Sequence, residues 1–172
     1  MKHGVIIVFG AAILAAATAQ AKPLETDWWR SNGAAVKEYT DAQEGVVCSL
    51  FLYRPNATLA VTWTRSNAEK ISFHENDWWF QPDQQLAVAM EIGGSWLDGS
   101  LGGNPPHLMA ETQRDHLSVT IDQPIEPLLE KATSVTVRLA DRETSVDVDT
   151  HTMRKLLRAV KRCRAVLKLG PG

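Results

Sequence analysis

The sequence lacks the short motifs by which many small enzymes are recognised. It has no H-E-x-x-H or His-x-His pair, which disfavours a zinc hydrolase, and no G-x-S-x-G, which disfavours a serine esterase. Its paired glycines are not followed by Lys-Ser or Lys-Thr, as a phosphate-binding loop requires. The two cysteines form no C-x-x-C, so a redox dithiol is disfavoured as well. These absences predict no catalytic residue, no bound metal and no cofactor.

Long hydrophobic runs are also scarce, and the one present stands near the N-terminus. An uncharged apolar run from Val5 to about Ala19 follows a short basic start and leads into Ala19-Gln20-Ala21, which suits a signal peptidase. The run is shorter than the roughly 20 residues of a transmembrane helix. We therefore expect a signal peptide at residues 1–21 and one periplasmic or secreted domain at 22–172, without a transmembrane segment after cleavage. An uncleaved N-terminal anchor is the alternative.

The two cysteines, Cys48 and Cys163, are expected to form a structural disulfide, because an isolated pair in an exported protein usually oxidises. A bond that closes a loop of this span stabilises a fold by about 4 to 5 kcal/mol in the chain-entropy model. It would tie the C-terminal part of the chain to the first strong strand. Two buried free thiols are the alternative that the sequence leaves open.

Alternating apolar and polar residues between turn residues predict an antiparallel β protein. The clearest case is Val46 to Thr64, where Arg54-Pro55-Asn56 divides two apolar runs into a hairpin. The other expected strands lie at 24–39 (two strands around Ser31-Asn32-Gly33), 70–74, 78–80, 86–92, around Trp96, 107–112, 117–121, 135–139 and 145–148. Their spacing predicts a mainly β fold, an antiparallel β-sandwich or an open barrel, with an α+β fold as the alternative. Of the adjacent Trp28 and Trp29, only one is expected to face the core.

One amphipathic helix is predicted near the C-terminus, over about residues 149–168. Asp149 is a good N-cap residue. The apolar residues that recur at spacings of three and four are Met153, Leu156, Leu157, Val160, Cys163 and Leu167. The basic residues predicted on the other faces are Arg154, Lys155, Arg158, Lys161, Arg162 and Arg164. This helix is expected to pack on the β domain and close it, and a second, short helix is expected within Ile125 to Ala132.

Charge is unevenly distributed along the chain. All 20 acidic residues precede Thr150, whereas seven of the 18 basic residues follow Asp149. The residues predicted to bind a partner are Arg154, Lys155, Arg158, Lys161 and Arg162 of the helix, together with Trp79 as an exposed aromatic edge. Such a surface suits an anionic envelope component or an acidic face of another exported protein. A solvated helix face that offsets the acidic body is the alternative, and nucleic acid is disfavoured because the body is acidic.

The order of elements near the C-terminus resembles that of a known family. Its parts are the segment Ile125 to Ala132 (IEPLLEKA), Thr136-Val137-Arg138-Leu139, Ser145-Val146-Asp147-Val148 and the closing helix, with Cys48-Ser49-Leu50 earlier in the chain. This layout is similar to that of the invasion-associated locus B family of small exported β-rich bacterial proteins. The resemblance implies an envelope or secreted protein without established catalytic residues.

The remaining candidates for chemistry are carboxylates, histidines and tryptophans. His74, His107, His116 and His151 are scattered in the sequence, which predicts no metal site. Glu91 and Asp98, with Trp96 and the Trp78-Trp79 pair, are candidates for a sugar-binding groove.

Two functional hypotheses follow from these observations. The leading one is a non-catalytic exported binding or accessory protein. The alternative is a small exported hydrolase with a site around residues 91–116, built from at least two of Glu91, Asp98, His107 and His116.

Overall fold

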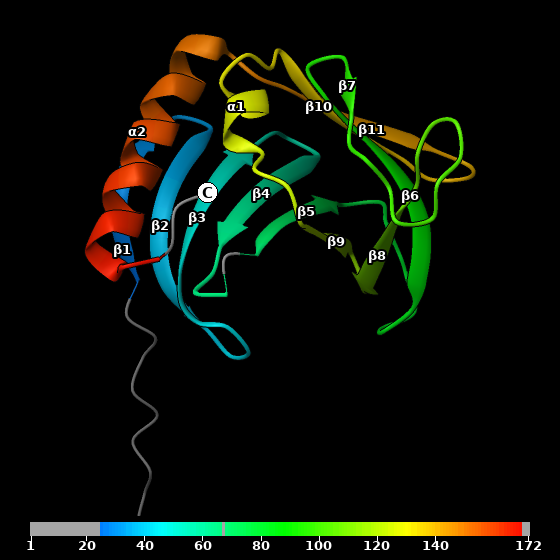
Figure 1. Ribbon diagram of the computed structural model, residues 1–172, viewed down its shortest axis with the longest axis horizontal. Coiled ribbons are helices and arrows are strands. Elements are labelled where there is room, and N and C mark those ends of the chain that lie inside the picture. The colour runs from blue at the N-terminus through cyan, green and yellow to red at the C-terminus, as the bar shows by residue number, and fades with distance from the viewer. Residues whose placement is uncertain (1–24, 67, 170–172) are drawn as a thin grey trace, which may run out of the picture.

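The computed structural model describes residues 25–66 and 68–169, and the predicted signal peptide, residues 1–21, lies outside this part of the chain. The described part contains one antiparallel sheet and two helices (Figure 1). The strands are β1 (Thr26–Ser31), β2 (Ala34–Asp41), β3 (Gly45–Tyr53), β4 (Ala57–Trp63), β5 (Glu69–Glu75), β6 (Gln85–Ile92), β7 (Ser95–Trp96), β8 (Leu108–Gln113), β9 (His116–Ile121), β10 (Ser134–Arg138) and β11 (Glu143–Asp147). The helices are α1 (Glu126–Leu129) and α2 (Thr150–Leu167).

The sheet runs in the order β1-β2-β3-β4-β5-β9-β8-β6-β10-β11, and β7 pairs with β6 alone. Figure 1 shows the sheet bending around an interior without closing into a barrel. The bend brings β11 near the β3–β4 turn, where the Arg54 guanidinium donates to the Asp147 carbonyl. Nearby, Thr144 Oγ1 donates to Glu75 Oε2 at 2.8 Å. The predicted mainly β fold with a C-terminal helix is therefore confirmed, in its open form.

Strand alternation divides the sheet into an inner and an outer face. In β4, Leu59 and Val61 are buried, while Ala60 between them is half-buried on the other face. In β5, Ile71 and Phe73 are buried, and Ser72 lies between them on the outer face. The inner residues belong to one apolar cluster that also contains the buried face of α2. One core thus joins the sheet to the helix, and the outer face lies on the opposite side of the sheet.

Helix α2 agrees closely with the predicted helix at 149–168. The Asp149 side chain caps it by accepting a hydrogen bond from the Thr152 N–H at 2.7 Å. Lys168 ends the helix in a left-handed conformation. Met153 and Leu156 are fully buried within the shared core. The predicted apolar stripe is therefore the packing face of the helix.

Cys48 in β3 and Cys163 in α2 form a disulfide, with their Cα atoms 6.2 Å apart. Both cysteines are fully buried, and Trp28 and Leu169 pack against them. The predicted disulfide is confirmed, and it links the last helix to the first long hairpin.

The predicted strand at 78–80 is not formed. The Trp78 N–H donates to the Glu75 carbonyl at 3.1 Å and closes a turn. The side chains still alternate, since Trp78 and Phe80 are buried with their rings edge to face and Trp79 is 72 % exposed. Alternation alone therefore predicted a strand where no neighbouring strand supplies a ladder.

The prediction that only one of Trp28 and Trp29 faces the core is also wrong. The pairing of β1 with β2 shifts between Asp27 and Trp29, which is a β-bulge. A bulge interrupts strict alternation, so both indoles are half-buried and both pack against the core. Trp28 Nε1 also donates to Glu38 Oε2 at 3.0 Å.

Glu69 begins β5 with its carboxyl turned inward, and only 3 % of the residue is exposed. Its Oε2 accepts a hydrogen bond from the Ile125 N–H at 2.9 Å, which joins the sheet to the segment before α1. Burial raises the pKa of Glu69, while the bond from Ile125 and the positive charge of Arg164 oppose the rise.

The raised pKa of Glu69 predicts a pH dependence of stability. The folded chain binds this proton more tightly than the unfolded chain. The contribution of Glu69 to the free energy of unfolding is therefore fully present below the ordinary pKa of 4.5. It is lost as the pH rises through the pKa of Glu69 in the folded chain. Glu69→Gln keeps an acceptor for Ile125 and removes the titration. Between about pH 4.5 and 7, urea denaturation should show the variant losing less stability than the parent chain. Exposed Glu130→Gln is the control, and parallel curves for Glu69→Gln and the parent would contradict the prediction.

Candidate functional site

The exposed side of α2 is the first candidate site. Because Met153, Leu156, Leu157, Ala159, Val160 and Cys163 face the core, the residues between them face outward. The exposed cations of this side are Arg154, Lys155, Arg158, Lys161 and Arg162. We call these five residues the basic face. All of them were predicted partner-binding residues, and the helix holds them on one rigid element.

A shallow groove of about 560 Å³ runs beside the basic face and is lined by Trp29, Lys155, Arg158 and Arg162. The bulge in β1 brings the Trp29 indole to this position. The groove therefore offers positive charge and one aromatic side chain together. The sequence did not single out Trp29 for this role, because a bulge cannot be recognised from alternation.

Trp79, the aromatic residue predicted for this surface, contacts other elements. It lies between β5 and β6, with the Arg114 guanidinium of the β8–β9 turn 5.5 Å from its ring centre. Helix α2 instead contacts β1, β2 and β3. A role for Trp79 in binding stays a prediction, and Trp29 is the tryptophan beside the basic face.

Two cations of α2, one of them in the basic face, are engaged within the protein. Arg164, predicted to lie on an outer face, is buried and forms an ion pair with Glu126, which corrects that prediction. Lys161 is exposed but has its Nζ 3.8 Å from Glu126 Oε2. The cations most available to a ligand are consequently the other four of the basic face.

A second candidate site lies on the outer face of the sheet. A groove of about 750 Å³ crosses strands β4, β5, β9 and β8, between the β2–β3 turn and the start of β6. Its lining residues are Tyr39, Asp41, Ala42, Gln43, Glu44, Ala60, Thr62, Thr64, Lys70, Ser72, Asp83, Gln85, Glu111, Thr112, Gln113, His116 and Ser118. We call it the polar groove, because nearly all of these side chains carry a hydrogen-bonding group.

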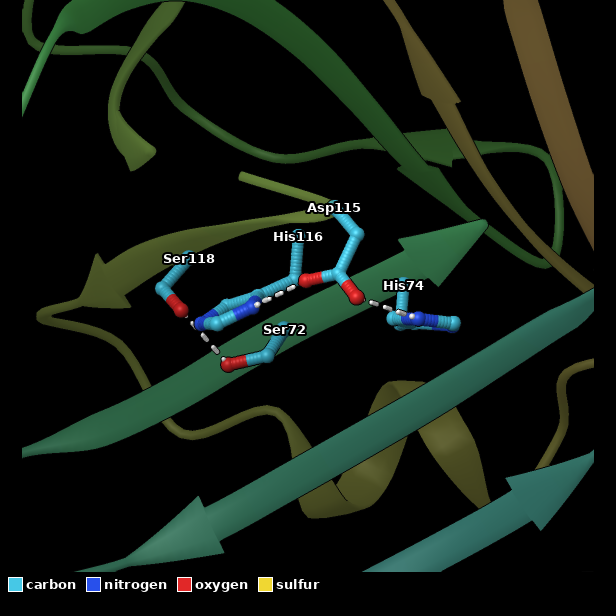
Figure 2. Close-up of polar contacts among 5 residues, drawn as sticks. All are labelled: Ser72, His74, Asp115, His116 and Ser118. Carbon is cyan, nitrogen blue, oxygen red and sulfur yellow. Dashed lines mark hydrogen bonds and ion pairs between the residues drawn. The ribbon is translucent and has the colours of Figure 1, made fainter. Parts of the chain in front are cut away.

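Two histidines meet at the end of the polar groove. His74 of β5 and His116 of β9 are directly opposite each other in the strand register. Figure 2 shows the Asp115 carboxylate between their rings, accepting from His74 Nε2 at 3.0 Å and from His116 Nδ1 at 3.2 Å. The hydrogen bond from His116 is the main cause that lowers the pKa of Asp115, with a smaller effect from His74. The ionised carboxylate thus holds both imidazoles in place.

A pair of hydroxyl groups lies beside these histidines. Ser72 and Ser118 hydrogen bond to each other at 2.8 Å across β5 and β9 (Figure 2). Within residues 25–66 and 68–169, no group of three His, Cys, Asp or Glu side chains has the arrangement of a metal site. The polar groove therefore presents hydroxyl, imidazole, amide and carboxylate groups as a surface for hydrogen bonding.

The four residues proposed for a hydrolase do not share a site in the described part of the chain. Glu91 lies 3.9 Å from Arg138, while Asp98 borders a neighbouring cavity of about 560 Å³ that shares Gln85, Glu111 and Ser118 with the polar groove. His107 packs so closely on Gly99 that an added Cβ there would meet its carbonyl at 2.0 Å. His116 alone lines the polar groove. The convergence that the hydrolase hypothesis requires is absent from these contacts.

The sugar groove predicted from Glu91, Asp98 and the tryptophans is not formed either. The Arg138 guanidinium covers Trp96 at 4.7 Å from the ring centre. Trp78 is 2 % exposed and belongs to the core. Indoles that are covered or buried cannot stack on a sugar ring, and the exposed Trp79 has the Arg114 guanidinium 5.5 Å from its ring centre.

No protein-family model, curated protein or solved structure matches this chain. The resemblance to the invasion-associated locus B family therefore stays a prediction. None of the helices in the described ranges is both long and apolar enough to cross a bilayer. The geometry of the two candidate sites is consequently the basis for a proposed function.

The sequence does not reveal the His74–Asp115–His116 group, because its two histidines lie far apart along the chain. In the structure His74 and His116 come together because β5 pairs with β9, although more than forty residues separate the two histidines. The available signal was Asp115-His116 at the start of a strand. Glu75, which follows His74 directly in the sequence, accepts from Thr144 instead.

Proposed function

We propose that this protein is an exported, non-catalytic binding protein that contacts an anionic component of the cell envelope through the basic face of α2. The observation that carries the proposal is the arrangement of Lys155, Arg158 and Arg162 around one groove beside Trp29. Guanidinium groups bind phosphate and carboxylate by two parallel hydrogen bonds, and an adjacent indole accommodates an apolar part of the ligand.

The disulfide supports an oxidising compartment for this function. Disulfides persist outside the cytosol, and the bond between Cys48 and Cys163 is fully buried. A rigidly held helix also keeps the cations at fixed positions. The predicted signal peptide agrees with a location outside the cytosol.

The contact is expected to be mainly electrostatic. The apolar stripe of α2 is occupied by the protein's own core, so the helix has little left to insert into lipid. Each Lys or Arg near an anionic membrane surface contributes about 1 kcal/mol, and this attraction is screened by salt. Binding should therefore weaken strongly between about 0.1 M and 1 M salt.

The test is the triple variant Lys155→Glu, Arg158→Glu, Arg162→Glu. Loss of three attractive charges predicts about 3 kcal/mol, or about a 100-fold weaker association with vesicles containing phosphatidylglycerol. The measurement is vesicle flotation at about 0.1 M salt. The thermal unfolding midpoint should stay near that of the parent, because these side chains are exposed. Lys161 is left unchanged, since a carboxylate there would face Glu126.

A matched control reverses three exposed cations elsewhere, Arg65→Glu, Lys131→Glu and Arg142→Glu. It changes the net charge by the same amount and should retain vesicle binding. Equal losses in the two triple variants would mean that net charge decides binding, which contradicts a specific basic face. Binding to a soluble anionic polysaccharide but not to vesicles would mean that the anionic ligand is a polysaccharide and not a lipid. Failure to bind either would contradict the proposal.

A further inference from the structure

The polar groove has a location and a chemistry that the proposed function does not use. It is formed by outward-facing residues of β4, β5, β8 and β9, whereas the inward-facing residues of these strands share a core with α2. The groove and the basic face therefore lie on opposite sides of the sheet. The volume of the polar groove, about 750 Å³, is within the range of ligand-binding sites, about 300 to 1,000 Å³.

The hydroxyl groups of the groove offer both donors and acceptors. In the Ser72–Ser118 pair one hydroxyl donates to the other, so one hydrogen and several lone pairs stay available to a ligand. Ser49 Oγ donates to Tyr39 Oη at 3.3 Å, which leaves the phenol hydrogen of Tyr39 to donate. The Gln85 and Gln113 side chains each add a donor and an acceptor. A ligand with many hydroxyl groups matches this mixture.

The charges of the groove disfavour an anionic ligand. Its charged or basic lining residues are Asp41, Glu44, Asp83 and Glu111, against Lys70 and His116. Asp41 accepts hydrogen bonds from the N–H groups of Glu44 and Gln43, and these bonds lower its pKa, so it is ionised near neutral pH. Phosphate, sulfate or uronate groups would be repelled there. Carboxylates instead accept hydrogen bonds from neutral hydroxyl groups.

Aromatic rings flank the groove on the same face of the sheet. Tyr39 lines it, and its ring centre lies 6.4 Å from that of Phe51. Phe51 is directly opposite Ala60, which also lines the groove, and the Tyr53 ring is stacked on Phe51 at 5.9 Å. Apolar faces next to a row of hydroxyl groups suit a sugar, which has C–H faces and hydroxyl edges.

We propose that the polar groove binds a neutral oligosaccharide chain laid across β4, β5, β9 and β8. The hydroxyl, amide and carboxylate groups hold the ring hydroxyls, and Tyr39 packs against a ring face. Asp115 holds His116 at the end of the groove by a hydrogen bond, and the imidazole there is one more polar group that can contact the ligand. This site does not rest on the proposed function of the basic face.

The experiment is a titration of the full exported chain with cellohexaose, chitohexaose and maltohexaose, followed by heteronuclear NMR and calorimetry. At least one of them should bind saturably and shift the signals of Ser72, Gln113, His116 and Ser118. Ser118→Arg places a long side chain in the groove next to Glu111, its partner across the strands, and should abolish binding. Tyr39→Ala should weaken binding about tenfold, as loss of one aromatic contact implies.

Matched variants separate this site from the basic face. The triple variant Lys155→Glu, Arg158→Glu, Arg162→Glu should bind the oligosaccharide as the parent does. If Ser118→Arg unfolds, the pair Ser72→Ala with Ser118→Ala replaces it and should weaken binding about tenfold. Absence of saturable binding by all three oligosaccharides at about 10 mM would overturn the proposal. Full binding by the groove variants, or a preference for anionic sugars, would overturn it as well.

Discussion

Replacing both cysteines, Cys48→Ala with Cys163→Ala, is expected to lower the free energy of unfolding by about 4 to 5 kcal/mol. The disulfide joins residues separated by 115 positions, and a loop of about this length carries a chain-entropy contribution of about 4.7 kcal/mol. The removed sulfur atoms add a small cavity, because both sites are fully buried. Urea denaturation of the parent and the variant, each at constant pH, measures the difference.

The location of the bond makes this effect large. Residues 49–162 lie within the closed loop, so the cross-link restricts most of the described chain in the unfolded state. Helix α2 still has its apolar stripe in the core, so the variant should fold, but it should unfold at a lower urea concentration than the parent. Cys163→Ala alone breaks the same bond and should lose nearly as much. A loss below about 1 kcal/mol in the double variant would contradict the entropic account.

The extent to which the sequence predicted the fold differs between local and long-range features. The hairpin around Arg54-Pro55-Asn56 and helix α2 follow from alternation, a breaker cluster and a capped apolar stripe, all of which are local patterns. Strand order is not local. Alternation tells which residues of β5 share a face, but it does not tell that β9 lies beside β5. The polar groove depends on that pairing and could not be predicted.

The candidate sites show the same division. The basic face follows from helical periodicity, since five cations lie between the residues of the stripe. Trp29 reaches the face only because β1 contains a bulge. Arg164 follows Cys163 on the helix and was predicted outside, yet it is buried. A guanidinium is buried only when partners compensate its charge, and those partners come from other elements.

Arg164→Ala is expected to lower the free energy of unfolding by about 3 kcal/mol, much more than the loss of an exposed cation would. Only 7 % of Arg164 is exposed. Its guanidinium forms an ion pair with Glu126 of α1 and lies 5.9 Å from the centre of the Trp63 ring in β4. Removing it leaves the largely buried carboxylate of Glu126 near that of Glu69, without the cation that faces both. The dominant cost is a largely buried charge left with only the exposed Lys161 nearby, at 3.8 Å.

A double-mutant cycle separates the ion pair from packing. Glu126→Gln removes the stranded charge, so the double variant with Arg164→Ala should lose less stability than the sum of the two single variants. Arg162→Ala is the control, because Arg162 lies two residues before Arg164 on the exposed side of α2. It should change the free energy of unfolding by no more than about 0.5 kcal/mol. Urea denaturation at constant pH gives all four values. If Arg164→Ala behaves like Arg162→Ala, the contact between α2, α1 and the sheet does not depend on this guanidinium. In that case the helix is held by its apolar stripe and the disulfide alone.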